Sequence, residues 1–211
     1  MTTTIRVARK KADSYQHGDL REALIQAGLK LLSAGDPAAL TLRAAAQLAG
    51  VSHAAPYRHF RDKQALVAAI AERGFRQLSA AMREELARCS SSRSRDRILA
   101  LGVGYVRFAT SNPASLRVIF GGVLGAEEVP PDLTAAGDEA YAILREEIAR
   151  GIERRELRQG EPDQLALASW SLVHGLSTLL INGAIPAPPN AAAEREMVMG
   201  IVGLLGVGLY A

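Results

Sequence analysis

The chain of 211 residues has one cysteine, few aromatic residues, and no apolar run long enough to span a bilayer. Cys89 cannot form an internal disulfide; both an inert packed or exposed thiol and a redox-sensitive thiol are open for it. The apolar stretch 197–211 is too short and Gly-rich to cross a membrane, and the polar, basic N-terminus does not resemble a signal peptide. These absences predict a cytoplasmic protein that does not bind a membrane.

The sequence also lacks a convincing strand pattern and any recognisable catalytic motif. Its four histidines give no Ser-His-Asp order and no metal-ligand spacing, and no phosphate-binding loop is present. The paired acids 127–128 and 146–147 are adjacent, so they point to different sides of a helix, as is common on surfaces. We expect no catalytic residues, no metal and no cofactor, and an enzyme is the main competing class.

Charge is distributed unevenly along the chain. Residues 1–63 carry ten Lys and Arg against five Asp and Glu, whereas the remainder carries 15 basic and 17 acidic residues. The start of this basic part, 1–14, contains a cluster of four cations, Arg6, Arg9, Lys10 and Lys11. It is either a solvated tail or an arm that follows DNA phosphates or enters a minor groove. The pattern suggests a nucleic-acid-binding head on a nearly neutral body.

The most informative segment is 40–66, which predicts two short helices joined by a tight turn. Thr41 is a good N-cap, and Gly50 permits the left-handed backbone that ends the first helix. Ser52 is expected to cap a second helix that runs to about Phe60. Pro56 lies in the first turn of that helix, where we expect it to stiffen the helix without breaking it. This spacing is typical of a helix-turn-helix, whose second helix enters the DNA major groove.

The segment resembles the TetR family of bacterial transcriptional regulators. The matching residues are Thr41, Ala46, Ala49, Gly50, Val51, Ser52, Tyr57, His59, Phe60, Lys63 and Leu66. Ala46 is expected to be buried because a larger side chain would push the two helices apart. The resemblance implies that Tyr57, His59 and Lys63 bind phosphate, and that Thr41 does so at the start of the first helix of the motif.

Other residues of the motif are better suited to base edges than to phosphates. The candidates are Arg43, Ser52, His53 and Ala54, since arginine can bind guanine and alanine can meet a thymine methyl. Pro56 completes the predicted DNA-binding set. Leu42, Leu48, Val51 and Phe60 are expected to be core residues instead.

Helical periodicity continues through the rest of the chain, which predicts an all-α fold of about nine helices. The first helix begins near residue 18 and ends at Gly35, and a long helix over 62–88 links the head to the body. The later helices are expected over 98–111, 113–120, 133–158, 162–185 and 193–209. The predicted domains are a basic arm over 1–14, a helix-turn-helix domain over 15–62, and a ligand-binding and dimerisation domain over 63–211.

The body contains one sharper motif. Trp170, His174 and Gly175 resemble the Trp-x-x-x-His-Gly pattern of one class of TetR-family C-terminal domains. Trp170 and His174 share a helix face because they are four residues apart. Two interpretations are open: a packed tryptophan with a hydrogen-bonded histidine, or direct contact with a ligand. Expected ligand-lining residues are Tyr105, Phe108, Phe120, Tyr141, Trp170 and His174.

The last two predicted helices are suited to a dimer interface. Glycines in a helix cost about 1 kcal/mol each relative to alanine, which suggests close approach of another backbone. Close packing within one monomer is the alternative. The expected interface residues are Leu172, Gly175, Leu176, Leu179, Gly200, Gly203 and Leu204.

The sequence therefore predicts a homodimeric regulator that binds a palindromic double-stranded DNA operator and is released by a small, apolar or aromatic effector. Repression, release by an effector and dimerisation are what the family resemblance implies. A DNA-binding architectural protein without an effector is the second alternative.

Overall fold

The computed structural model describes residues 17–34, 37–121 and 129–209. These residues form eight α-helices and two short 3-10 helices, without a strand, so the all-α prediction is confirmed. The α-helices are α1 (His17–Ser33), α2 (Leu42–Ala49), α3 (Lys63–Arg88), α4 (Ser94–Ser111), α5 (Pro113–Phe120), α6 (Pro131–Glu153), α7 (Pro162–Ile181) and α8 (Ala191–Leu209). The 3-10 helices are η1 (Pro37–Ala39) and η2 (Ala55–Arg58). The basic arm 1–14 and Gly35 lie outside the described residues.

The missing ninth helix is the second helix of the helix-turn-helix. A helix from Ser52 to Phe60 was predicted, but this segment forms only η2. The Ser52 side chain does not cap it; the Ser52 carbonyl instead accepts from the Ala55 N–H at 3.0 Å. Pro56 has no N–H to extend the pattern and disfavours helical backbone at the preceding residue. The prediction that Pro56 leaves the helix intact was therefore wrong.

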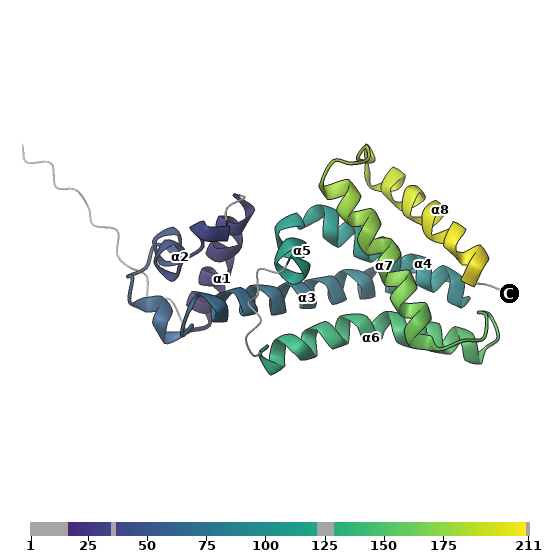
Figure 1. The fold of residues 1–211 in the computed structure, drawn as a ribbon, viewed down its shortest axis with the longest axis horizontal. Helices are drawn as coiled ribbons and strands as arrows, with labels where there is room; N and C mark the ends of the chain where they lie inside the picture. Colours follow the sequence, from purple (N-terminus) through teal and green to yellow (C-terminus); the bar gives the residue numbers. More distant parts are fainter. Residues whose placement is uncertain (1–16, 35–36, 122–128, 210–211) are drawn as a thin grey trace, which may run out of the picture.

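Helix α3 is the spine of the molecule. Its 26 residues span about 39 Å and run from the head into the body (Figure 1). Asp62 caps its start by accepting from the Ala65 N–H at 2.8 Å. Farther along, Gly104 of α4 lies so close that a Cβ there would sit 2.7 Å from the Ala81 carbonyl oxygen. This close crossing fixes α4 against the spine.

Around this spine the body helices form a bundle in which α4 is central. Helices α5, α6 and α7 each begin with a proline, Pro113, Pro131 and Pro162, at a position where its missing N–H has no intrahelical partner. Figure 1 shows α7 and α8 side by side on the outer face of the body, and α8 packs on α4. Helix α7 is long and apolar enough to cross a bilayer by length and composition alone. It packs against α4, α6 and α8, so it is a core helix with one open face. The expectation that the chain contains no apolar run of membrane-spanning length was wrong.

The head and the body have separate hydrophobic cores that meet at α5 and α6. The head core gathers residues of α1, α2 and the first turns of α3, and it also includes Val118 of α5 and Leu133 of α6. Phe75 of α3 packs against both cores. The division at residue 62 stays a prediction, since packing is continuous across it.

Candidate DNA interface and effector site

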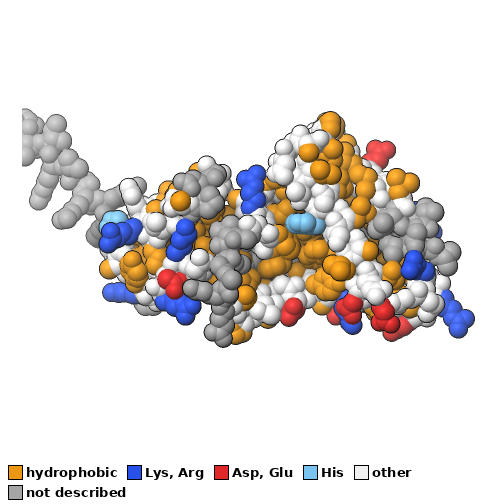
Figure 2. Space-filling view, in the orientation of Figure 1, with side chains coloured by type: hydrophobic (Ala, Val, Ile, Leu, Met, Phe, Trp, Pro, Cys, Tyr) orange, Lys and Arg blue, Asp and Glu red, His pale blue; other side chains and the backbone are white. Residues whose placement is uncertain are grey.

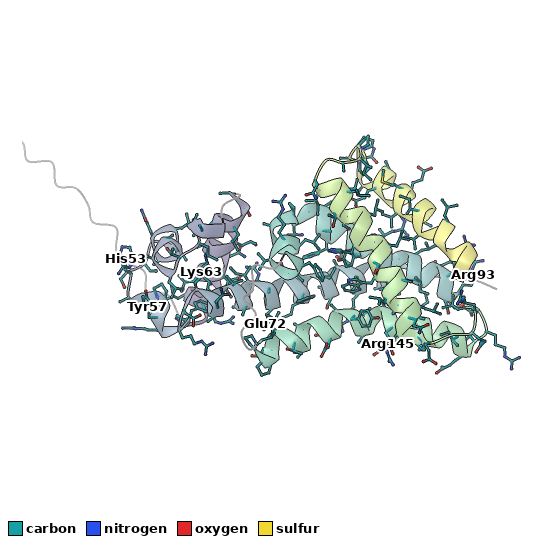
Figure 3. All side chains as sticks on the ribbon, in the orientation of Figure 1. His53, Tyr57, Lys63, Glu72, Arg93 and Arg145 are labelled. Carbon is teal, nitrogen blue, oxygen red and sulfur yellow. The ribbon has the colours of Figure 1, made fainter. Side chains whose placement is uncertain are left out.

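The residues predicted to contact DNA lie mostly at one end of the molecule. Six of the nine are exposed: Thr41, Arg43, Ser52, His53, Ala54 and Tyr57. His53 and Tyr57 lie at the end of the head that faces away from the body (Figure 3). Tyr57 is 56% exposed, so its ring and hydroxyl are available to a partner.

The turn that presents these residues is set by backbone conformation, hydrogen bonds and one small side chain. Gly50 has a φ of 72°, which confirms the predicted left-handed end of α2. The Val51 N–H then donates to the Ala46 carbonyl at 3.0 Å, which closes the turn. Ala46 is fully buried beneath it, as predicted. The Thr41 hydroxyl accepts from the Ala44 N–H at 3.0 Å, and its own proton can still be donated to a phosphate.

Three predicted DNA contacts differ in accessibility. Pro56 is buried, so it shapes the loop and cannot be a DNA contact as predicted. His59 and Lys63 are partly buried at the base of the same loop. Asp62 already places a carboxylate at the start of α3, so a phosphate near Lys63 depends on the lysine side chain rather than on a vacant helix end.

The core predictions for the head are mixed. Phe60 and Leu42 are buried, as expected, and Val51 is partly buried. Leu48 was predicted to be core but is 50% exposed. Its position one turn beyond Ala44 on α2 directs it away from the side that carries Ala45 and Ala46.

Cations collect on the head surface. Among the described residues, Arg43 and Arg58 form no ion pair, whereas Arg61 pairs with Asp62 at 3.0 Å. Figure 2 shows Lys and Arg side chains, with a histidine, around the head end. A phosphate backbone is the partner that such a surface fits.

An aromatic cluster lies in the body and joins five helices. Its ring contacts are Tyr105–Trp170 at 5.0 Å, Tyr141–Trp170 at 5.7 Å, Phe120–His174 at 4.7 Å and Phe75–Phe120 at 5.7 Å between centroids. Five of the six predicted ligand-lining residues therefore meet. Phe108, the sixth, is buried in the body core.

The polar centre of this cluster is one hydrogen bond. The Tyr105 hydroxyl lies 2.8 Å from His174 Nδ1. Burial raises the pKa of Tyr105 well above its usual range and lowers the pKa of His174, so both groups are neutral near pH 7. The neutral tautomer of His174 decides which of the two groups donates, because a tyrosine hydroxyl can both donate and accept.

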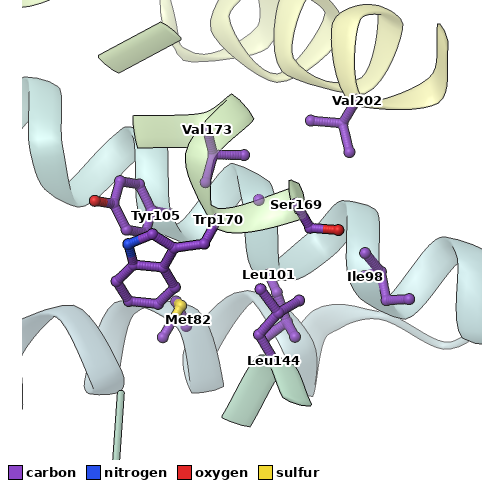
Figure 4. Close-up of a pocket in the computed structure, with 10 residues that line it drawn as sticks. Met82, Ile98, Leu101, Tyr105, Leu144, Ser169, Trp170, Val173 and Val202 are labelled. Carbon is purple, nitrogen blue, oxygen red and sulfur yellow. The ribbon is translucent and has the colours of Figure 1, made fainter. Parts of the chain in front are cut away.

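Two cavities flank this pair. An inner cavity of about 20 Å³ has an almost wholly apolar lining that includes Met82, Leu101, Trp170 and Val173 (Figure 4). It has room for about one water molecule. A groove of about 180 Å³ lies on the other side, between α5 and α7. Its lining residues are Leu116, Arg117, Phe120, Gly121, His174, Thr178, Ile181 and Asn182.

The predicted dimer residues divide into a buried and an exposed group. Leu176 is buried in the monomer core, so its prediction as an interface residue is not supported by its position. Leu179 and Leu204 are strongly exposed, Leu204 by 75%, and Leu172 and Gly203 are partly buried. A Cβ added at Gly175 or Gly200 would meet nothing within 4 Å. Close packing inside one monomer therefore does not explain these two glycines.

Sequence analysis missed several residues of these sites. Arg117 lines the groove and could have been found from its position three residues before Phe120, on the same face of α5. Leu167 and Met199 extend the exposed apolar face of α7 and α8, and Phe75 joins the aromatic cluster to the head. No local signal distinguishes Phe75 from an ordinary core residue.

A short helix-turn-helix head, a long connecting helix and a helical body are the architecture of a helix-turn-helix transcription regulator. The model for bacterial regulatory proteins of the tetR family matches residues 24–70, and that for the tetracyclin repressor-like C-terminal domain matches residues 98–200. The chain belongs to the TetR family of DNA-binding transcriptional regulators, which are not enzymes.

Three known proteins illustrate what this chain is similar to. The nucleoid occlusion factor SlmA of Marinobacter nauticus is 29% identical over 140 residues, which cover 66% of this chain and 70% of SlmA. A protein of unknown function from Rhodococcus sp. RHA1 is 30% identical, with a TM-score of 0.81 over 94% of this chain and 100% of that one. The TetR family regulator PfmR from Thermus thermophilus shares the fold, with 21% identity and a TM-score of 0.67 over 89% and 99% of the two chains.

Proposed function

We propose that this protein is a cytoplasmic, homodimeric repressor that leaves a palindromic operator when a small apolar or aromatic molecule binds its body. The observation that carries the proposal is the position of α5. Val118 belongs to the head core, and Phe120, two residues later, belongs to the aromatic cluster of the body. A ligand that shifts Phe120 therefore moves an element on which the head rests, which couples the two sites.

The DNA contacts that we propose are Arg43, Ser52, His53 and Ala54 at base edges, with Thr41, Tyr57, His59 and Lys63 at phosphates. The exposure of the first group and of Tyr57 supports these roles. We also propose that the body belongs to the Trp-x-x-x-His-Gly class; in support, Trp170 and His174 both contact Tyr105, and Gly175 faces open space. The hydrogen bond between Tyr105 and His174 supports the interpretation of His174 as a packed, hydrogen-bonded residue, and we propose that it also contacts the ligand.

For the dimer we propose an interface of the exposed faces of α7 and α8, through Leu179, Leu204, Gly175 and Gly200. Leu179→Asp combined with Leu204→Asp is expected to give a monomer by sedimentation. Val129→Asp, at an exposed apolar position outside these helices, is the matched control and should remain dimeric. A monodisperse wild-type monomer at micromolar concentration would contradict the proposal.

The regulatory function is tested by selecting genomic fragments with the purified protein at two salt concentrations. A palindromic site that survives the higher salt supports a specific dimeric regulator. Binding that ignores sequence and disappears with salt would contradict it.

A second candidate is a DNA-binding architectural protein without an effector. The small inner cavity favours it, and the SlmA relative is named for nucleoid occlusion. Release of the operator by any small molecule would exclude this candidate.

A further inference from the structure

The groove between α5 and α7 has an aromatic wall and one cationic rim. Arg117 and Phe120 line it from α5, and His174 faces them from α7. The Phe120 and His174 rings form the wall, with centroids 4.7 Å apart. The groove volume is about 180 Å³, and an apolar cavity of about 150 Å³ holds benzene in another protein. The groove therefore accommodates one ring or a short alkyl chain.

The charge in this groove is not balanced by its lining. Arg117 is the only charged residue among the eight described residues that line it. Within the part of the chain that the structure describes, Arg117 forms no ion pair. Other arginines of the body are bonded to carboxylates, such as Arg145 to Asp163 at 2.7 Å and Arg97 to Glu147 at 2.7 Å. An exposed guanidinium beside an apolar wall is suited to a carboxylate carried on an apolar molecule.

The polar groups opposite Arg117 carry no negative charge. Burial lowers the pKa of His174, so its ring is neutral near pH 7, and its Nδ1 lies 2.8 Å from the Tyr105 hydroxyl. Thr178 donates its hydroxyl proton to the His174 carbonyl at 2.9 Å, and Asn182 contributes an amide. The described lining of the groove thus offers no carboxylate that would repel an anion.

We propose that the groove binds a small organic monoanion whose carboxylate pairs with Arg117 and whose apolar part lies against Phe120 and His174. This inference rests on the proposed effector response and names the chemical class of the effector. Val118, which follows Arg117 directly, is buried in the head core. An anion that pulls on Arg117 therefore acts on the turn of α5 that supports the head.

The test uses three carboxylates, benzoate, phenylacetate and hexanoate, each paired with its neutral carboxamide. Trp170 is the only tryptophan and lies 6.3 Å from the Phe120 ring, so its fluorescence reports binding to the full-length protein. We expect each acid to bind at least about tenfold more tightly than its amide. Arg117→Gln should remove this preference, whereas Arg83→Gln, at an exposed arginine of α3 paired with Glu139, should preserve it. Phe120→Ala should weaken acids and amides alike.

Equal affinity for acids and amides, acid binding that Arg117→Gln does not change, or no binding of either series would each overturn the proposal. Operator affinity measured with the same compounds separates it from the proposed function. An amide that releases the operator as well as its acid overturns the anionic class and leaves the effector response standing. Acid binding through Arg117 with unchanged operator affinity supports the anion site and overturns the effector response.

Discussion

Two exposed arginines of the head contrast with two arginines of the body that bind a buried carboxylate. In the head, Arg43 and Arg58 are exposed and form no ion pair among the described residues. In the body, Arg97 donates two hydrogen bonds, at 2.7 and 2.8 Å, to the buried carboxylate of Glu147, and Arg150 pairs with the same group at 3.0 Å. Arg43 and Arg58 are thus available to a partner, whereas Arg97 and Arg150 are fixed in the fold.

The body carries a second buried carboxylate that holds the outer helix in place. Glu85 of α3 is 3% exposed and is bonded by Arg88 and by Arg107 of α4, and by Arg195 of α8 at 2.8 Å. Burial alone would raise the pKa of Glu85, but these arginines outweigh it and hold the pKa below its ordinary value. Helix α8, which carries part of the proposed dimer face, is thereby tied to the spine that carries the head.

The comparison predicts that breaking a body ion pair has the largest effect on folding. Glu147→Gln should lower the free energy of unfolding by about 3 kcal/mol, because it leaves Arg97 partly buried without its charge partner. Urea denaturation measures this change. Glu139→Gln removes the exposed Arg83 pair and should cost less than about 1 kcal/mol. Equal losses in both variants would show that burial does not distinguish the two pairs.

In the head, substitution of an exposed arginine should change DNA recognition and leave the free energy of unfolding unchanged. Arg43→Ala should reduce discrimination between operator and mismatched DNA by about 2 kcal/mol, since the proposed bidentate base contact would be lost. Fluorescence anisotropy with matched and mismatched duplexes measures this, with denaturation as the control for folding. Unchanged discrimination would assign Arg43 to a solvated surface.

Loss of a proposed phosphate contact should weaken binding to every DNA sequence, by less than the loss of discrimination expected for Arg43→Ala. Lys63→Ala is expected to lower affinity for operator and random DNA alike and to reduce the salt slope by about 0.9. Tyr57→Phe removes a neutral hydroxyl, so it should cost about 1 kcal/mol in affinity with little change in slope. A slope that falls equally in both variants would contradict the neutral role of Tyr57.

The head was largely predictable from sequence because its signals are local. Thr41 begins α2 and Gly50 ends it through their own backbone conformations. Ala46 is buried, as the close approach of the two helices of the motif predicts. The length of the second helix was not predictable in the same way. Pro56 lacks a backbone N–H donor and disfavours helical backbone at the preceding residue. The segment predicted to form a nine-residue helix therefore forms a four-residue 3-10 helix.

The body was predictable in its helices but only partly in its sites. Periodicity and prolines located α4 to α8 within a few residues, whereas side-chain roles depend on which helices pack together. Leu176 and Leu179 were both predicted to be interface residues, yet Leu176 lies in the core and Leu179 on the surface. The groove at Arg117 requires α5 to lie across from α7, which no local pattern encodes.

The smallest effect that we expect concerns the neutral pair at the centre of the body. Burial holds the pKa of His174 below its ordinary value of 6.5, so below about pH 6.5 the unfolded chain binds a proton that the folded chain resists. Stability from this group is therefore complete above that pH and is lost as the pH falls. Denaturation at a series of pH values should show this loss in the wild type and not in His174→Gln.

Tyr105→Phe separates the effect of burial on the pKa of His174 from the effect of the hydrogen bond between Tyr105 and His174. It removes the 2.8 Å hydrogen bond and should cost about 1 kcal/mol near pH 7. It leaves His174 buried, so the loss of stability at lower pH should persist. Disappearance of that loss in Tyr105→Phe would show that the hydrogen bond, and not burial, controls the pKa of His174.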